Sequence, residues 1–215
     1  IKNYVKLDNY DNDPEIKSSD YLSKRLNGSN NDEICKLIQN DNLEEFISYI
    51  QKSNTSYDAT IEQSIYETNY LLIGKNPTLI DYAAFYGSIQ ILQYLLKNNV
   101  KTTPNLWLYA IHSNNLSLIH LFEENEIDLD QQLAKLLFKL SIKCHHIELA
   151  NYFLLKFLNC DEYYQFNTIQ KNFVDYSFHY YNYIFFPAKV DIHSIDTALI
   201  KYDHFDIFEI MCKNE

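Results

Sequence analysis

Glycine is scarce in this chain of 215 residues, which contains three glycines, four prolines and one tryptophan. Turn-rich β folds, Rossmann domains and phosphate-binding P-loops need glycine at tight turns and where the backbone approaches a ligand closely. The composition therefore disfavours all three of these architectures.

Positive charge is also scarce. The chain has 18 Lys and Arg residues against 29 Asp and Glu residues, a net charge of -11, and Arg25 is its single arginine. Binding to nucleic acid requires Lys and Arg to displace counterions, and adhesion to anionic lipid needs basic residues too. We expect neither a nucleic-acid nor a membrane partner. A partner protein with a basic surface is compatible with this charge, although solubility is an alternative reason for an acidic surface.

The four cysteines are far apart in the sequence and form no CxxC pair. This spacing fits reduced thiols in an intracellular protein, in the cytoplasm or the nucleus. The chain has no run of about 18 apolar residues and no basic-then-apolar leader at its start. It begins with Ile1 rather than Met, so we expect it to be part of a longer protein.

Catalytic and metal-binding motifs are missing as well. There is no GxSxG elbow, no kinase motif and no glycine-framed pair of carboxylates. His145 and His146 beside Cys144 are the most suggestive metal ligands, but neighbours on a helix diverge by about 100° and cannot share one ion. His112 and His120 are expected on different helices of one unit. We therefore predict a protein that is not an enzyme and holds no metal or cofactor.

The most regular stretch is 76–100, which predicts two short helices joined by a tight turn. Asn76 is a suitable N-cap and Pro77 is suited to the first position of a helix. Gly87 provides a left-handed residue that ends the first helix. The second helix has an apolar stripe with i, i+3, i+6, i+7 spacing, formed by Ile89, Leu92, Leu95 and Leu96.

A second copy of this unit follows at 103–127. Matching residues differ by 27 positions, as Tyr82 and Tyr109 do, and Asn114 takes the place of Gly87. Asn tolerates the left-handed conformation better than most residues. One helical pair is too short to bury its own apolar stripe, so we expect the copies to pack together.

These residues resemble the ankyrin repeat family. Thr78 to Gly87 (TLIDYAAFYG) is similar to its TPLHxAAxxG line, and Ile91 to Leu96 (ILQYLL) is similar to its IVxxLL line. Leu79 stands where the family has Pro, and Asp81 stands where it has the His that bonds the Thr hydroxyl. The spacing is shorter than the ~33 residues usual for ankyrin, so we expect no well-formed β-hairpin fingers. More closely, the chain resembles a divergent ankyrin-like domain of unknown function at the head of ankyrin arrays in protists.

Weaker copies of the unit lie on both sides of the clear repeats. Their turn positions are marked by Asp41, His145 and Asp203, which align with Gly87. We predict a repeat domain over 32–215, preceded by a polar leader or capping helix over 1–31. The weaker copies are at 32–52, 136–158 and 197–213, and an aromatic-rich insertion occupies 159–196.

Three segments have open interpretations. The leader has a short apolar pattern that either docks on the first repeat or stays loose, formed by Ile16, Tyr21, Leu22 and Leu26. Segment 59–73 is an amphipathic helix or a linker, with Ile61, Ile65, Tyr66 and Leu72 facing the stack. In the insertion, a helix through Phe173, Tyr176, Tyr180 and Tyr183 is favoured over a strand that alternates through Val174, Tyr176, Phe178 and Tyr180.

Together these patterns predict an all-α, ankyrin-like helical-repeat solenoid of about four to five helical pairs. The resemblance implies a protein-protein interaction or scaffolding module whose partner binds the concave face formed by the first helices. The residues implied for partner binding are Phe85, Tyr86, His112, Ser113, Lys143, Cys144, Lys201 and Tyr202.

Two alternatives stay open for this function. Phe85 and Tyr86 could pack on the adjacent unit instead of binding a partner. The domain could also be a structural N-terminal cap of a longer array with no partner of its own, and we expect further repeats to follow Glu215 because no polar capping unit ends the sequence.

Overall fold

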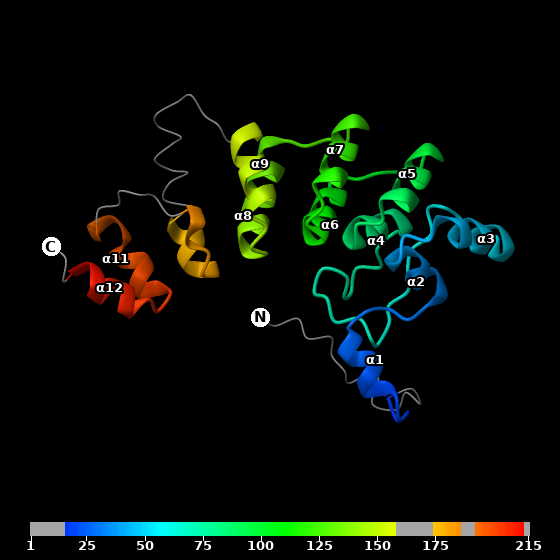
Figure 1. Cartoon of the computed structure of the whole chain (residues 1–215), viewed down its shortest axis with the longest axis horizontal. Coiled ribbons are helices and arrows are strands. Elements are labelled where there is room, and N and C mark those ends of the chain that lie inside the picture. Colours follow the sequence, from blue (N-terminus) through cyan, green and yellow to red (C-terminus); the bar gives the residue numbers. More distant parts are fainter. Residues whose placement is uncertain (1–15, 158–173, 186–191, 213–215) are drawn as a thin grey trace. The chain divides into compact units, whose positions relative to one another are not determined.

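The computed structural model describes residues 16–157, 174–185 and 192–212 (Figure 1). All regular elements among these residues are helices, and one isolated antiparallel bridge joins Thr60 to Thr78. The all-α prediction is thus confirmed for the described residues. None of their helices is both long enough and apolar enough to cross a membrane.

The helices are short and mostly arranged in pairs. They are α1 (Tyr21–Asn27), α2 (Glu33–Gln39), α3 (Leu43–Ser53), α4 (Leu79–Tyr86), α5 (Ile89–Lys97), α6 (Leu106–Ser113), α7 (Leu116–Glu124), α8 (Gln131–Lys143), α9 (Ile147–Phe157), α11 (Ile192–Lys201) and α12 (Phe205–Cys212). A further helix covers 174–180, and a 3-10 turn covers Tyr183–Phe185. The chain divides into two compact units, Ile1–Asp128 (unit 1) and Leu129–Glu215 (unit 2).

In unit 1, the pair α6–α7 repeats the pair α4–α5 at a constant distance along the chain. Each boundary of α6 and α7 lies 27 residues after its counterpart, as from Leu79 to Leu106. The residues that end α4 and α6, Gly87 and Asn114, both adopt the left-handed conformation, with φ of 76° and 51°. The first helices α2, α4 and α6 contact one another in series, as do the second helices α3, α5 and α7 (Figure 1).

Helix α4 is the centre of this packing. Six of its eight residues are buried, and the small side chains of Ala83 and Ala84 leave room for α2 on one side and α6 on the other. On α5, Leu92 and Leu95 of the predicted stripe are fully buried and its Ile89 and Leu96 are half-buried, while Ile91, outside that stripe, is fully buried too. Burying a Leu or Ile side chain contributes about 1.5–3 kcal/mol, so each of these fully buried residues stabilises the pair by about that amount.

The start of α4 differs from the sequence-based prediction. Asn76 is not the N-cap, because α4 begins at Leu79 with Thr78 as its cap. Thr78 and Asp81 form a capping box in which the Asp81 amide donates to the Thr78 hydroxyl and the Asp81 carboxylate accepts from the Thr78 amide, at 3.1 Å. The Thr78 hydroxyl also donates to the Asp81 carboxylate at 2.8 Å. This reciprocal pairing stabilises the later start.

Side chains in the turns join one helical pair to the next. Asp41 has a left-handed backbone, with φ of 49°. Its carboxylate accepts hydrogen bonds from the backbone amides of Gln90 and Ile91, at 3.1 and 3.0 Å. It therefore caps the first turn of α5 from the preceding pair. The buried Ser88 hydroxyl donates to the Ile38 carbonyl at the end of α2.

The segment between α3 and α4 is irregular, so the linker interpretation of 59–73 is correct and the helix is not. Three of its predicted inward residues, Ile61, Tyr66 and Leu72, are buried. The segment is joined to the start of α4 by hydrogen bonds from the Ile61 amide to the Pro77 carbonyl and from the Leu79 amide to the Ala59 carbonyl.

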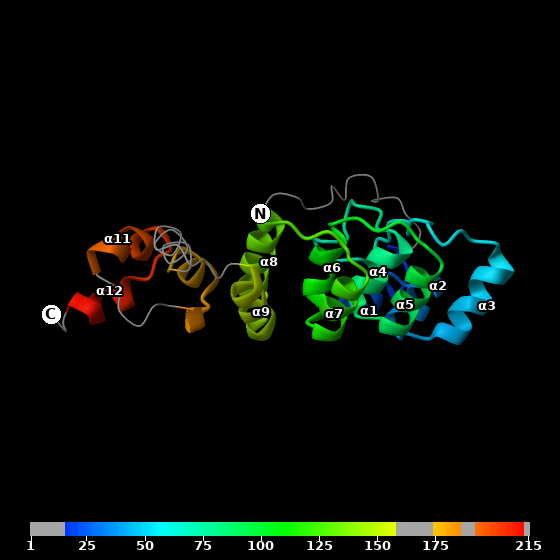
Figure 2. The same ribbon diagram turned by 90° about the horizontal axis from the view of Figure 1, so that it is seen from above.

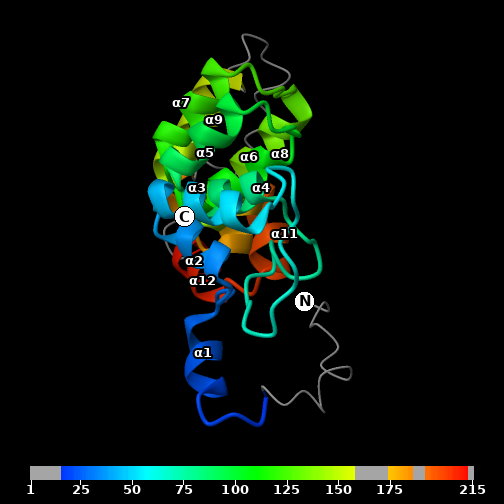
Figure 3. The ribbon, with the colours of Figure 1, turned by 90° about the vertical axis from the view of Figure 1, so that its right-hand side faces the viewer.

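Helix α1 is connected to this segment rather than buried by its own apolar residues. Leu22 and Leu26 are 72% and 86% exposed, so this half of the predicted pattern does not pack, whereas the half-buried Tyr21 ring lies 5.9 Å from that of Tyr66 in the segment. Instead the Thr68 amide donates to the Gly28 carbonyl at 3.0 Å, and the Arg25 guanidinium binds backbone carbonyls of the segment. Figure 3 shows α1 beside the loops of this segment.

In unit 2, α8 packs beside α9, and α11 beside α12 (Figures 1 and 2). The turns have His145 and Asp203 in the left-handed conformation. Val174 and Phe178 form a small core with Ile195 and Leu199 of α11. The helical interpretation of the aromatic-rich insertion is therefore confirmed for 174–180, whereas Phe173 lies outside the described residues.

Candidate partner-binding surface

The ends of α4 and α6 bring four of the predicted contact residues together. Phe85 and Tyr86 form the last turn of α4, and His112 and Ser113 form the last turn of α6. The Phe85 ring stacks on the His112 imidazole, with 3.9 Å between ring centroids and 14° between planes. The equivalent positions of two consecutive helical pairs are thus in direct contact.

Phe85 is packed inside this arrangement. Its side chain is 3% exposed, and the sequence left open whether it binds a partner or packs on the adjacent unit. The burial favours packing for Phe85. Tyr86 is half-buried, with its ring 4.8 Å from that of Tyr82 and 5.0 Å from that of Phe85. Burial raises the pKa of the Tyr86 hydroxyl, so it is a neutral hydrogen-bonding group at physiological pH.

His112 and Ser113 are half-buried as well. The Asn69 side-chain amide lies 3.0 Å from His112 Nε2 and donates to it, so segment 59–73 reaches the end of α6. The Ser113 hydroxyl donates to the Ala110 carbonyl at 2.8 Å. Ser113 also lies against Gly87, where an added Cβ would be 3.2 Å from the Ser113 Cβ. Tyr86, His112 and Ser113 are therefore held in place while part of each side chain stays open to solvent.

Lys143 and Cys144 lie at the end of α8, in unit 2. Lys143 is exposed and Cys144 is half-buried, and burial raises the pKa of the Cys144 thiol. A thiol with a raised pKa is a poor nucleophile and a poor metal ligand at neutral pH. Beside it, the Asn182 side-chain amide donates to the Ile142 carbonyl at 2.9 Å, which ties residues 181–185 to α8.

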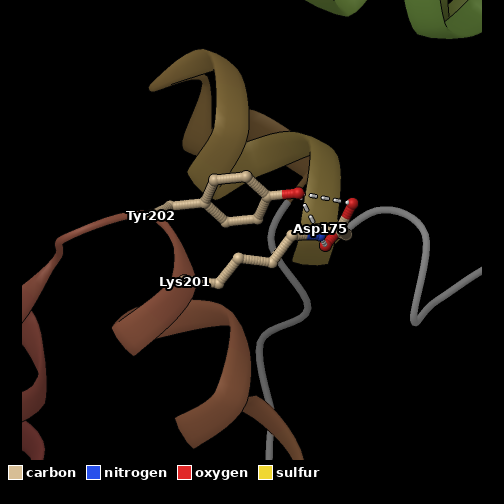
Figure 4. Close-up of polar contacts among 3 residues, drawn as sticks. All are labelled: Asp175, Lys201 and Tyr202. Carbon is tan, nitrogen blue, oxygen red and sulfur yellow. Dashed lines mark hydrogen bonds and ion pairs between the residues drawn. The ribbon is translucent and has the colours of Figure 1, made fainter.

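Lys201 and Tyr202, at the end of α11, are paired within unit 2 (Figure 4). The Tyr202 hydroxyl lies 3.0 and 2.9 Å from the two carboxylate oxygens of Asp175, and Lys201 Nζ lies 3.2 Å from one of them. Hydrogen bonds to Tyr202 and Asp175 raise the pKa of the exposed Lys201 ammonium. These contacts join α11 to the helix at 174–180.

Exposed apolar residues follow the helix at 174–180, in the aromatic-rich insertion. Tyr181 and Ile184 are 64% and 57% exposed. Beneath them, His204 is buried, with Nε2 2.8 Å from the Phe178 carbonyl and Nδ1 3.1 Å from the Tyr183 hydroxyl. His204 thus fixes the short turn that presents these side chains.

The sequence did not reveal a cavity between residues 25–30, segment 59–73 and α4. Its lining includes Arg25, Glu67 and Tyr82. Glu67 is 8% exposed and its Oε1 accepts from the Asn69 backbone amide at 2.9 Å, whereas its buried Oε2 has no hydrogen-bond partner among the residues that the structure describes. Burial raises the pKa of the Glu67 carboxyl. The single arginine of this acidic chain was the one sign in the sequence of a special site here, and it did not indicate that Glu67 would be buried.

Among the described residues, no three His, Cys, Asp or Glu side chains gather closely enough to hold a metal ion. No family model matches the chain, and no curated protein or solved structure shows significant similarity to it. The resemblance to ankyrin repeats therefore stays a prediction that depends on the residues quoted above.

Proposed function

We propose that this chain is a non-catalytic protein-binding module of ankyrin-like helical repeats, acting in the cytoplasm or nucleus. The recurrence of α4–α5 as α6–α7 after 27 residues supports this architecture, as does the serial contact of α2, α4 and α6. In the proposed solenoid, α2–α3, α8–α9 and α11–α12 are further copies of the unit. The acidic charge of the chain suits a partner with a basic surface.

One observation carries the proposal. Tyr86, His112 and Ser113 are half-buried at adjacent helix ends, each fixed by packing or hydrogen bonds. Side chains that are already ordered lose little conformational entropy when a partner docks. Tyr is also among the residues that most often contribute a large share of binding energy. Tyr86 is therefore the proposed anchor, and Phe85 supports it from below.

A second function is favoured by α3. Only Phe46 and Ile50 of this helix are buried, and its exposed residues are all polar, including Glu44, Glu45 and Lys52. Terminal repeats of a solenoid need such a polar outer face. The first helical pair is therefore suited to cap a longer array, with or without an external partner.

The variant Tyr86→Ala separates the two functions. The full chain is used as bait in cell extract, and bound proteins are quantified for wild type, Tyr86→Ala and the control Tyr49→Ala, which truncates a half-buried tyrosine on α3. A binding role predicts that Tyr86→Ala loses a protein that the other two retain, while its urea unfolding midpoint matches that of Tyr49→Ala. If Tyr86→Ala is much less stable and its bound proteins are unchanged, the binding function is wrong and the cap is favoured.

A further inference from the structure

The sequence contains one Asn-Gly pair, Asn27 and Gly28, at the end of α1. The backbone nitrogen of the residue after an asparagine can attack the Asn side-chain carbon Cγ and close a five-membered succinimide ring. A side chain on the attacking residue obstructs this approach, and glycine has none. The other two glycines follow Ile73 and Tyr86. By sequence, Asn27 is therefore the asparagine at which this reaction is least hindered.

The Asn27 side chain is accessible to solvent. Asn27 is exposed as the last residue of α1, and Gly28 ends the helix with φ of 69°. The Gly28 amide donates to the Arg25 carbonyl at 3.1 Å, in the last turn of the helix. Ring closure therefore requires this turn to open, so that the Gly28 nitrogen is free to approach the Asn27 side chain.

Helix α1 is suited to such opening. It has seven residues, and none of them is buried. A helix of this length is unstable in water by itself, so α1 depends on its contacts with segment 59–73 beside it (Figure 3). These include the Tyr21 and Tyr66 rings, 5.9 Å apart, and the Arg25 guanidinium bound to backbone carbonyls. Segments with few buried contacts open locally while the rest of a protein stays folded.

We propose that Asn27 is a site of spontaneous deamidation, and that its conversion releases α1 from segment 59–73. The Gly28 nitrogen loses its proton to solvent and bonds to Asn27 Cγ, while the Cγ–Nδ2 bond breaks and Nδ2 leaves as ammonia. Water then opens the ring. Attack at Cγ gives aspartate at position 27, and attack at the backbone carbonyl gives isoaspartate, in which the main chain runs through Cβ and Cγ. One water is consumed for each ammonia released, and nothing is oxidised or reduced.

Both products oppose the return of α1 to its closed position. Each adds a carboxylate at the C-terminal end of the helix, where the helix dipole is already negative. Isoaspartate also lengthens the main chain by one methylene group before Gly28. This displaces the Gly28 carbonyl, which accepts from the Thr68 amide at 3.0 Å and from the Thr68 hydroxyl at 3.2 Å. Conversion of Asn27 therefore shifts α1 towards the open state and keeps it there.

The direct test uses the wild-type chain alone and has an internal control. The full chain is incubated at physiological pH and temperature, and conversion of each asparagine is followed by peptide mapping with mass spectrometry. Asn54 is the control, because it is exposed at the end of α3 but precedes the β-branched Thr55. We expect Asn27 to convert at least about tenfold faster than Asn54, since glycine leaves the attacking nitrogen unhindered and threonine does not. Equal rates at the two positions, or no conversion of Asn27, overturn the proposal.

The opening step is tested with Arg25→Gln, which removes the guanidinium contacts to the carbonyls of segment 59–73. If α1 must open before the ring closes, this variant should convert Asn27 at least about threefold faster than wild type, as expected from the loss of one hydrogen bond to the open state. The rate at Asn54 should not change. An unchanged rate at Asn27 overturns the role of helix opening.

The release of α1 is tested with Asn27→Gln, because glutamine must close a six-membered ring and does so more slowly. Asn27 is exposed, so this variant should unfold at the same urea concentration as wild type. In limited digestion with trypsin, aged wild type should be cut after Lys24 and Arg25 faster than fresh wild type, whereas Asn27→Gln should be cut at the same rate before and after ageing. Conversion of Asn27 without faster cleavage overturns the release of α1, and faster cleavage of aged Asn27→Gln assigns the change to another residue and overturns it too.

Discussion

Replacement of Asp41 by alanine tests how one helical pair holds the next. The Asp41 carboxylate accepts from the Gln90 and Ile91 amides, which are two of the unsatisfied donors in the first turn of α5. Its carboxylate also lies at the positive end of the helix dipole. The backbone of Asp41 is left-handed, a conformation that alanine adopts at a cost.

The two effects have different sizes. Loss of an N-cap costs about 0.5–2 kcal/mol, and because Asp41 is only half-buried we take about 1 kcal/mol. A left-handed alanine adds about 1 kcal/mol. We therefore expect Asp41→Ala to lower the free energy of unfolding of unit 1 by about 2 kcal/mol. Asp41→Gly, which lacks the conformational cost, should lose about 1 kcal/mol, and Asp41→Asn, which keeps an acceptor, about 0.5 kcal/mol.

Trp107 makes this measurement specific to unit 1. It is the single tryptophan, lies in α6 and is 1% exposed, so its fluorescence reports whether α6 is packed. Urea unfolding should place the midpoint of Asp41→Ala about 1 M below wild type, at a typical m-value of about 2 kcal/mol/M. If Asp41→Gly and Asp41→Asn both keep the wild-type midpoint, the carboxylate contributes nothing and the inter-pair cap is refuted.

Three further changes have definite expected outcomes. Burial raises the pKa of Glu67 above its ordinary 4.5, so as pH rises the folded state keeps this proton longer than the unfolded state does. In urea unfolding, wild type should therefore lose stability relative to Glu67→Gln as pH rises above about 4.5. Parallel pH profiles of stability for the two proteins would contradict this. Gly28→Ala should loosen α1 in limited proteolysis more than Gly74→Ala, because both glycines have positive φ but only Gly28 has a side chain within 4 Å of an added Cβ. His204→Phe should destabilise unit 2 by about 1–2 kcal/mol in thermal unfolding, since it removes the hydrogen bonds to Tyr183 and the Phe178 carbonyl; an unchanged transition would show that packing of the ring suffices.

The helical pairs were predictable because their signals are local. The apolar stripe of α5 and the left-handed residues Gly87 and Asn114 lie within a few positions of the elements that they define. The same local reasoning misplaced the start of α4. Asn76 and Pro77 are good helix-starting residues, but the capping box of Thr78 and Asp81 satisfies two donors at once and the helix begins there.

The contacts around the candidate surface were not predictable because they join residues that are distant in sequence. Glu67 and the Arg25 side chain meet across 42 positions through an irregular segment that has no periodic pattern. The pairing of Tyr202 with Asp175 spans 27 positions. The burial of Phe85 likewise depends on His112, one helical pair away. Such pairings follow from tertiary packing, for which helical spacing alone carries no information.

The proposed anchor Tyr86 and the buried Glu67 are connected by segment 59–73. Glu67 Oε1 accepts from the backbone amide of Asn69, and the side-chain amide of Asn69 donates to His112. The His112 ring in turn stacks on Phe85, which contacts Tyr86. Groups that share a hydrogen-bond network couple by about 0.5–3 kcal/mol, whereas distant sites act additively. In binding to a protein that the wild-type chain captures, the effects of Glu67→Gln and Tyr86→Ala should therefore be non-additive. Asn69→Ala cuts the connection and should restore additivity; strict additivity in the intact chain would show that the two sites act separately.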